Sequence, residues 1–365
     1  MTNPTVSFIV PCYKLAHLLP ECISSILSQN YNDYEVLIMD DCSPDNTAEV
    51  AQSFRDKRIK HIRNNPNLGH LHNYNKGISL ARGKYVWLIS ADDYLRKPYV
   101  LERYVDLLNK NSRIGYTFCA GYGVRNGLET TVIGRYPVHG DQDRIIPGHM
   151  MLKRLLRWNF VLAASGLVRR ECYDKLSVFP LDMPWAGDWY LWCLFALYYD
   201  VGYFAEPMVC YRDHSLSMTT QLTRERLQAC AAEDIAIPLI IRKKAREAGY
   251  LLLAKELLPA IAHTYARVMA SERYRQSAVM SLEQFEDSLC RNIANEAERN
   301  LVRAHVYSDM GNEYYHAGST SLAKEFYRKA LSVNPWMGSA RLKRFLLCFG
   351  KAGDRLRKIL SFRLR

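Results

Sequence analysis

The nine residues YVWLISADD, residues 85–93, decide the fold of this 365-residue chain. An apolar run that favours a strand is followed at once by Ser90 and two adjacent aspartates. The same arrangement occurs twice upstream, in YEVLIMDD (residues 34–41) and in VSFIVPCYK (residues 6–14). Each stretch therefore predicts a buried strand that ends in polar residues.

Helix-like patterns separate these strands. Apolar residues recur at helical spacing in residues 16–29, and residues 47–54 and 71–81 predict two more helices, with a short strand at 59–62. This alternation predicts an α/β fold, in which a mostly parallel, Rossmann-like sheet carries helices on both faces. Ligands of such sheets bind beyond the carboxyl ends of the strands, so we expect the polar strand ends to converge on one crevice.

The pattern changes near residue 221, after which the sequence is rich in Lys, Arg, Glu and Ala and predicts helices throughout. We therefore expect a catalytic domain at 1–220 and an all-α domain at 221–365. Residues 304–337 match one tetratricopeptide repeat, which predicts either a helical hairpin that packs on its neighbours or a docking surface for a protein partner. Residues 341–365 predict a basic amphipathic tail, which suits either an anionic membrane or a cap on the helical domain.

Charge and cysteine content narrow the class of protein. The net charge of +12 predicts an anionic partner: nucleic acid, an acidic membrane surface or a phosphate-bearing substrate. Ten cysteines occur singly, without CxxC spacing, and predict free thiols in a reducing compartment. No signal-peptide pattern is present, and the longest apolar run, 189–199, is shorter than the roughly 20 residues of a membrane span. We expect a cytoplasmic protein, soluble or peripheral to the inner face of the cell membrane.

The strand-end carboxylates suggest metal chemistry. Two adjacent carboxylates, Asp92 and Asp93, are costly at the end of a buried strand unless a cation meets them. Mg²⁺ or Mn²⁺ bridging to a diphosphate would serve, although an Asp pair is also common in helix caps and turns. The sequence contains no GxxxxGK[ST], GxGxxG near the first strand, GxSxG or HExxH, which argues against P-loop kinases, dinucleotide dehydrogenases, common hydrolases and zincins.

Taken together, these segments resemble the family 2 glycosyltransferases, which have the nucleotide-diphospho-sugar transferase fold. The resemblance covers residues 5 to about 218. It includes the opening strand and turn at 6–14, the Asp-Asp-x-Ser-x-Asp-x-Thr segment at 40–47, and the Tyr-Arg-x-His-like segment at 211–217. Lys14 stands where the family usually has Asn, and Ser90 stands where it has the first metal-motif Asp.

The resemblance implies a role for individual residues. The nucleotide pocket would contain Pro11, Tyr13, Asp41 and Asp92, with Asp41 at the base and Asp92 near the ribose. Asp93 would bind Mn²⁺ or Mg²⁺, and His214 would contact the metal or the diphosphate.

Three further positions complete the implied site. Asp188, in the segment Gly187-Asp188-Trp189, matches the family's catalytic base, with Asp182 as the second choice. Ser165, Gly166 and Trp189 would lie on the acceptor side.

The predicted function is therefore an inverting, metal-dependent, non-processive transfer of a sugar. The donor would be a nucleotide diphosphate sugar, by default a UDP-sugar, and the acceptor a hydroxyl of a glycan or lipid-linked molecule in polysaccharide or lipopolysaccharide assembly. The alternative is an inactive transferase-fold scaffold that binds a partner through its helical domain. A nucleotidyltransferase fits less well, because no Gly-rich basic loop follows the first strand. A nucleic-acid binder fits less well too, because no nucleic-acid motif occurs.

Overall fold

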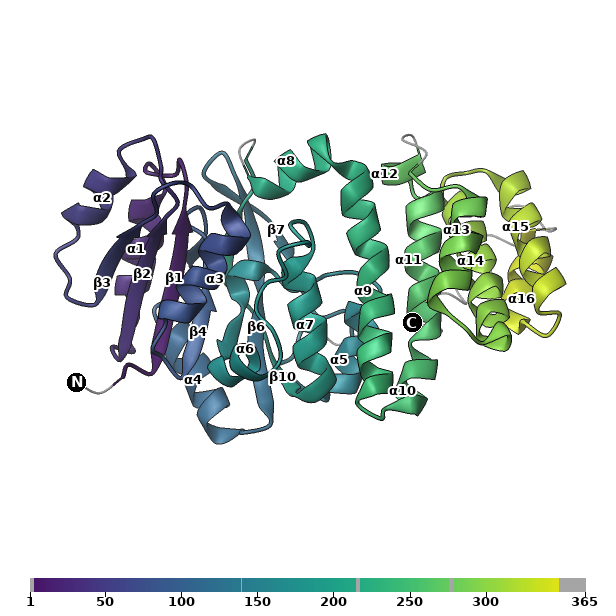
Figure 1. Ribbon diagram of the computed structural model, residues 1–365, viewed down its shortest axis with the longest axis horizontal. Coiled ribbons are helices and arrows are strands. Elements are labelled where there is room, and N and C mark those ends of the chain that lie inside the picture. Colours follow the sequence, from purple (N-terminus) through teal and green to yellow (C-terminus); the bar gives the residue numbers. More distant parts are fainter. Residues whose placement is uncertain (1–2, 139, 215–216, 276–278, 348–365) are drawn as a thin grey trace. The chain divides into compact units, whose positions relative to one another are not determined.

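The first four strands lie parallel in the order β3-β2-β1-β4, as the sequence predicts for an α/β fold (Figure 1). Strand β1 spans Val6–Cys12, β2 spans Tyr34–Asp40, β3 spans Ile59–Arg63 and β4 spans Tyr85–Leu88. Helices α1 (Leu19–Leu27), α2 (Thr47–Ser53) and α3 (His70–Leu80) connect them in turn. The predicted helices and strands up to residue 89 are therefore confirmed, with ends that differ by a few residues.

Alternate residues of β1 pack against helices on opposite faces of the sheet. Phe8 and Val10 belong to a core that also contains Ile23 of α1 and Tyr104 of α4 (Val100–Lys110). Ile9 points to the opposite face, where it packs closely against Gly77 of α3. A Cβ added to Gly77 would lie only 2.5 Å from the Cγ2 atom of Ile9. Every residue of β1, β2 and β4 is buried, which explains why the sequences of these three strands are largely apolar.

Beyond β4 the sheet becomes mixed. Strand β9 (Leu167–Arg169) is antiparallel to both β4 and β6 (Ile114–Arg125), and β10 (Asp200–Arg212) returns parallel to β6. The remaining strands are antiparallel additions: β5 (Tyr94–Leu95), β7 (Leu128–Ile133) and β8 (Arg144–Ile146). The main path of the sheet has the order β3-β2-β1-β4-β9-β6-β10-β5, with β7 paired to β6 and β8 paired to β10 off this path.

This computed structural model describes residues 3–138, 140–214, 217–275 and 279–347, which fall into two compact units, Met1–Leu222 and Thr223–Arg365. The other helices of the first unit are α5 (Gly148–Leu155), the 3₁₀ turn η1 (Ala163–Ser165), α6 (Arg170–Lys175) and α7 (Gly187–Tyr198). Helix α8 (Met218–Glu225) contains the boundary between the two units.

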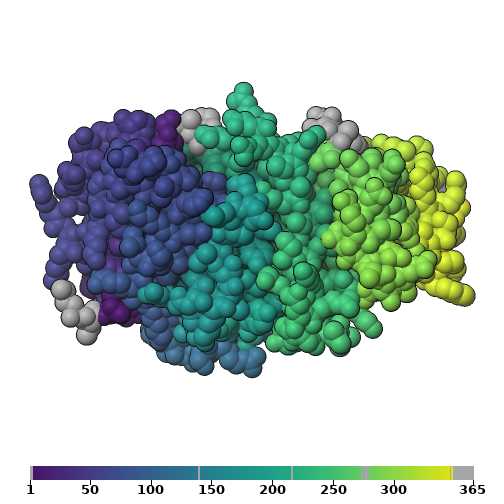
Figure 2. Space-filling view, viewed as in Figure 1, coloured from purple at the N-terminus to yellow at the C-terminus, as the bar shows by residue number. Residues whose placement is uncertain are grey.

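The second unit is helical, and its buried apolar side chains form a core of their own. Figure 2 shows one face of its surface, coloured from green to yellow. Its helices are α9 (Leu227–Glu247), α10 (Leu251–Glu256), α11 (Leu258–Ala270), α12 (Glu272–Arg275), α13 (Leu282–Asn292), α14 (Glu296–His316), α15 (Thr320–Val333) and α16 (Gly338–Leu346). Helices α14 and α15 form a hairpin in which Tyr327 lies against Gly311 and donates a hydrogen bond to Asn312 Oδ1 (2.9 Å). In the described part of the chain, no helix combines the length and apolarity of a membrane span.

Candidate functional site

Polar residues that follow β1, β2 and β4 meet at one edge of the sheet. In the parallel register Cys12 lies beside Asp40, and Ile9 lies beside Leu88. Residues just past these strand ends line one hollow, here termed the strand-end cavity, which includes Pro11, Tyr13, Asp41 and Asp92. The structure thus brings together all four residues that the sequence analysis assigned to a nucleotide.

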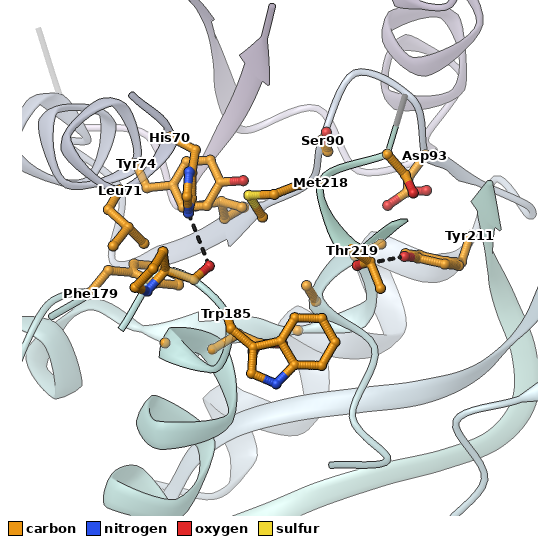
Figure 3. Close-up of a pocket in the computed structure, with 18 of the residues that line it drawn as sticks. His70, Leu71, Tyr74, Ser90, Asp93, Phe179, Trp185, Tyr211, Met218 and Thr219 are labelled. Atoms are coloured by element: carbon orange, nitrogen blue, oxygen red, sulfur yellow. Dashed lines mark hydrogen bonds between the residues drawn. The ribbon is translucent and has the colours of Figure 1, made fainter. Parts of the chain in front are cut away.

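A second hollow adjoins the first and is rich in aromatic side chains. This aromatic cavity shares His70, Tyr74, Ser90, Asp92 and Met218 with the strand-end cavity. Rings of seven residues line it: His70, Tyr74, Tyr173, Phe179, Trp185, Trp192 and Tyr211. Asp93 and Tyr211 lie across the cavity from His70, Tyr74 and Phe179 (Figure 3). Asp93 and Asp188 also line it, so predicted metal and base positions border one space.

Asp41 is buried and orders the loop that leads into α3. Its Oδ1 accepts hydrogen bonds from the Leu68 amide (2.8 Å) and from Asn64 Nδ2 (2.8 Å), and its Oδ2 accepts one from the Gly69 amide (2.9 Å). A carboxylate offers about four acceptor positions. The three bonds therefore hold the loop and leave acceptor capacity for a donor in the strand-end cavity.

The turn after β1 has an unusual backbone. Lys14 adopts φ 59°, a left-handed conformation that Asn tolerates better than Lys, and its amide donates to Ser43 Oγ (3.2 Å). The neighbouring Tyr13 ring is 44% exposed at the rim of the strand-end cavity. Strain of this kind gathers at ligand sites, and here it presents an aromatic face on which a flat ring could stack.

Arg212 ties the Asp92–Asp93 turn to the end of β10. Its backbone amide donates to Asp93 Oδ1 (2.9 Å), its Nη1 donates to the Asp92 carbonyl (2.9 Å), and its Nη2 pairs with Glu21 of α1 (2.6 Å). His214 Nε2 lies 2.9 Å from Asp92 Oδ2. Burial, the largest single effect, would raise the pKa of Asp92, but hydrogen bonds with His214 and Ser90 and the nearby His214 charge together hold the pKa below its ordinary value.

Asp188 begins α7 and faces the aromatic cavity. Its Oδ1 accepts from the Trp189 amide (2.6 Å), and its Oδ2 accepts from Asn159 Nδ2 (3.2 Å). Burial raises its pKa to about 6, which suits a base that works near neutral pH. Asp182, the second choice, is exposed and lies outside the described linings of both cavities.

Two of the three acceptor-side positions need correction. Gly166 lines the aromatic cavity as expected. Ser165 does not, because its hydroxyl is buried and donates to the Leu162 carbonyl (2.8 Å) inside the η1 turn. Trp189 does not either, because its indole is 3% exposed and its Nε1 donates to the Leu155 carbonyl of α5 (2.8 Å). Trp185 and Trp192 line the cavity instead.

Sequence reasoning gave no role to several lining residues. Tyr211 and Arg212 precede His214 in the segment that resembled the family, so a signal for them was present. Tyr74 and His70 follow the loop that Asp41 holds, but their helical spacing only predicted a packed helix face. Burial lowers the pKa of His70 and raises that of Tyr211 to about 12, so both rings are neutral near pH 7.

The chemistry of the carboxylates fits a hard divalent cation. Asp93 is 5% exposed, and burial together with the adjacent Asp92 raises its pKa well above the ordinary value. A cation at Asp93 would offset the negative charge that the two adjacent carboxyls bring together. Among the described residues, no group of three or more His, Cys, Asp or Glu side chains could hold a metal alone. Mg²⁺ needs only one or two protein carboxylates when substrate phosphates and water complete its shell, so the donor set fits.

Comparisons with known proteins show which proteins this chain is similar to. Residues 7–173 match the family model described as Glycosyl transferase family 2. An uncharacterized glycosyltransferase of Haemophilus influenzae is 29% identical over 228 residues, which are 61% of this chain and 70% of that protein. Uncharacterized glycosyltransferase EpsJ of Bacillus subtilis is 30% identical over 51% of this chain and 54% of its own length. Glycosyltransferase GlyG of Streptococcus pneumoniae is 25% identical over 50% and 51%. The chain thus spans about half the length of the latter two relatives.

Solved structures match more of the chain. Residues 1–349 of S. aureus TarS, in complex with UDP-GlcNAc, superpose with a TM-score of 0.63 at 19% identity, covering 89% of this chain and 92% of that one. The UDP complex of the same protein gives a TM-score of 0.61 at 17% identity. At this level of identity the likeness shows a shared fold.

Proposed function

We propose that this chain, whose residues 7–173 match the family 2 glycosyltransferase model, is an inverting, metal-dependent enzyme that moves a sugar from a nucleotide diphosphate to an acceptor hydroxyl. The observation that carries the proposal is the meeting of three distant carboxylate positions, Asp41, Asp92–Asp93 and Asp188, around two adjoining cavities. Asp41 would contact the nucleotide, Asp93 would contact the metal, and Asp188 would act as the base.

We favour a UDP-sugar as the donor. The strand-end cavity provides an exposed Tyr13 ring for the base, acceptor capacity at Asp41 for a base N–H, and Asp92 toward the ribose. The TarS structures, which share the fold, contain UDP and UDP-GlcNAc. Placing the diphosphate beside Asp93 would direct the donor sugar into the aromatic cavity.

The transfer follows from the position of Asp188. Its carboxylate would accept the proton of the acceptor hydroxyl as that oxygen attacks the anomeric carbon from the side opposite the diphosphate. A metal held at Asp93 would neutralise negative charge on the departing diphosphate. Rings around the cavity would exclude water, which limits hydrolysis of the donor.

Calorimetric titration tests this function directly. We expect UDP to bind with Mn²⁺ present, to bind at least about tenfold more weakly with EDTA, and to bind better than GDP or dTDP, because the diphosphate otherwise meets unmatched carboxylates. Folded protein that binds none of these nucleotides with metal present would instead favour the inactive-scaffold alternative, and attention would move to the helical unit.

We further propose that the acceptor is presented at an anionic membrane surface, against which the end of the helical unit lies. Trp336 is 84% exposed and Phe345 59% exposed. Trp336 precedes the basic helix α16, and Phe345 lies in its last turn. Arg341 of the same helix lies 5.3 Å from the Trp336 ring centroid. Exposed aromatic rings beside basic side chains suit the boundary between headgroups and acyl chains. Residues 348–365, the rest of the predicted amphipathic tail, lie outside the described residues, and this part of the tail stays a prediction.

Vesicle binding checks the membrane proposal. In the full chain, Trp336→Ala combined with Arg341→Glu should weaken binding to phosphatidylglycerol vesicles by about tenfold or more, since each basic residue near the surface contributes about 1 kcal/mol. The control is Leu252→Ala, which removes a 72% exposed apolar side chain elsewhere in the unit. Equal binding by both proteins would leave the helical hairpin, and a protein partner, as the better proposal.

A further inference from the structure

Trp192 lies one helical turn after Asp188, and both side chains line the aromatic cavity. Residues four apart on a helix project from the same face, so the two side chains are neighbours. The indole is 5% exposed and packs against Tyr116, with ring centroids 5.0 Å apart. Its position is therefore fixed by packing rather than by a hydrogen bond.

The indole N–H of Trp192 is an exception among the buried tryptophans of the first unit. Trp87 Nε1 donates to the Ala164 carbonyl (2.8 Å), and Trp189 Nε1 donates to the Leu155 carbonyl (2.8 Å). Trp192 Nε1 is equally buried, yet it has no hydrogen-bond partner among the described residues. Buried donors are nearly always paired, because an unpaired one loses its bond to water without replacement. An orphan donor in a cavity lining points to a ligand atom.

Trp192, which carries the orphan donor, lines the same cavity as Asp188. The indole N–H lies close enough to that carboxyl to lower its pKa, although the geometry is not that of a hydrogen bond. A donor and an acceptor thus lie close together on successive turns of one helix, in the wall of the aromatic cavity. A hydroxyl group, which both donates and accepts, satisfies both at once.

Gly166 helps to hold the ring in place. A Cβ at this position would lie 2.3 Å from Trp192 Cη2 and 3.0 Å from its Cζ2. The ring therefore occupies space that only glycine leaves open, with Tyr116 also packed against it. Groups that are fixed before the substrate arrives lose little freedom when it binds, which favours a role in orienting a reacting atom.

We propose that Trp192 and Asp188 bind the nucleophilic hydroxyl of the acceptor sugar between them. The hydroxyl oxygen accepts a hydrogen bond from Trp192 Nε1 on one lone pair and attacks the anomeric carbon with the other. As that bond forms, the bond from the anomeric carbon to the diphosphate breaks and its electron pair leaves on the diphosphate, while the hydroxyl proton passes to Asp188. This assignment rests on the proposed function, and Tyr173, Phe179 and Trp185 supply apolar surface for the sugar ring around the hydroxyl.

The test compares Trp192→Phe, which keeps a ring but removes the N–H, with Trp189→Phe as the matched control on the same helix. Release of UDP from UDP-GlcNAc, UDP-glucose and UDP-galactose is measured with water and with methyl glycosides as acceptors, and UDP affinity by calorimetry. We expect Trp192→Phe to lower kcat by about tenfold or more with unchanged UDP affinity, because one hydrogen bond to a reacting group is lost. The acid limb of its pH profile should move to higher pH. Trp189→Phe should lower stability and leave both readouts unchanged.

A second variant keeps the proposal testable even if Trp192→Phe misfolds. Gly166→Ala forces the indole to move without removing its N–H, and it should lower kcat with UDP affinity intact. Wild-type turnover by both Trp192→Phe and Gly166→Ala would overturn the assignment of Trp192 and leave the proposed function standing. A wild-type protein that neither binds UDP nor releases it from a donor would overturn the proposed function, and the assignment with it.

Discussion

Replacing Asp188 by Asn should lower kcat by about 10²–10⁴-fold, because the acceptor hydroxyl loses its base. The affinity for UDP should stay unchanged, since Asp188 lines the aromatic cavity and lies outside the described lining of the strand-end cavity. Single-turnover transfer and UDP calorimetry on the same sample separate the two effects. The control is Asp182→Asn, which changes an exposed carboxylate nearby in sequence. Turnover within a few fold of wild type in Asp188→Asn would remove this residue from the mechanism.

The same carboxylate predicts the pH dependence of the wild-type enzyme. Burial raises the pKa of Asp188 to about 6, so its basic form decreases as the pH falls below that value. We expect kcat/KM to be level near pH 7–8 and to fall about tenfold for each unit below about pH 6. A profile that stays level down to pH 5 would argue that another group accepts the proton.

Stability should change in the opposite direction to activity. A carboxyl whose pKa is higher in the folded protein favours folding when protonated, and this contribution is lost as the pH rises through about 6. Asp188→Asn should therefore raise the free energy of unfolding at pH 7 by about 1–2 kcal/mol, with little effect below pH 4. Denaturant unfolding at the two pH values measures the difference, which also excludes misfolding as the reason for lost activity.

Replacing Asp93 by Asn should produce the second large loss, here in both binding and turnover. The charge that would meet the metal disappears while the shape of the side chain and its contact with the Arg212 amide are kept. We expect UDP binding to become insensitive to Mn²⁺ and kcat/KM to fall by about 10²–10³-fold, as several kcal/mol of charge stabilisation are removed. Titration with Mn²⁺ and EDTA provides the measurement, and Asp182→Asn again serves as the control. A variant that still responds to Mn²⁺ would place the metal elsewhere.

Much of the sheet and of the strand-end cavity was predictable, because both depend on local sequence. The polar ends of β1, β2 and β4 each follow a largely apolar strand, and parallel pairing brings such ends to one edge of the sheet. Asp41, Asp92 and Asp93 could therefore be grouped without coordinates. The antiparallel pairing of β9 with β4 and β6, and the parallel pairing of β10 with β6, were not predicted, since they depend on long-range contacts that short patterns do not record.

The choice between tryptophans on α7 shows where sequence reasoning fails. Ten of the twelve residues of this helix are buried, so its apolar pattern has no period that distinguishes the cavity side from the core side. Trp189 was predicted on the acceptor side and Trp192 was given no role, whereas in the structure Trp192 lines the aromatic cavity and Trp189 lies outside its described lining. Ser165 failed for a related reason, because the direction of its hydroxyl is set by the η1 turn and not by the residue type.

Because tryptophans line the aromatic cavity, their intrinsic fluorescence can report ligand binding at the site. Trp185 and Trp192 border the space that a sugar would fill, while Trp87 and Trp189 are enclosed in the core. Emission from the first pair will shift or be quenched when a ligand displaces water from their rings, and the second pair will give a constant background. Intrinsic fluorescence can therefore rank unlabelled donor and acceptor candidates before any product has been identified.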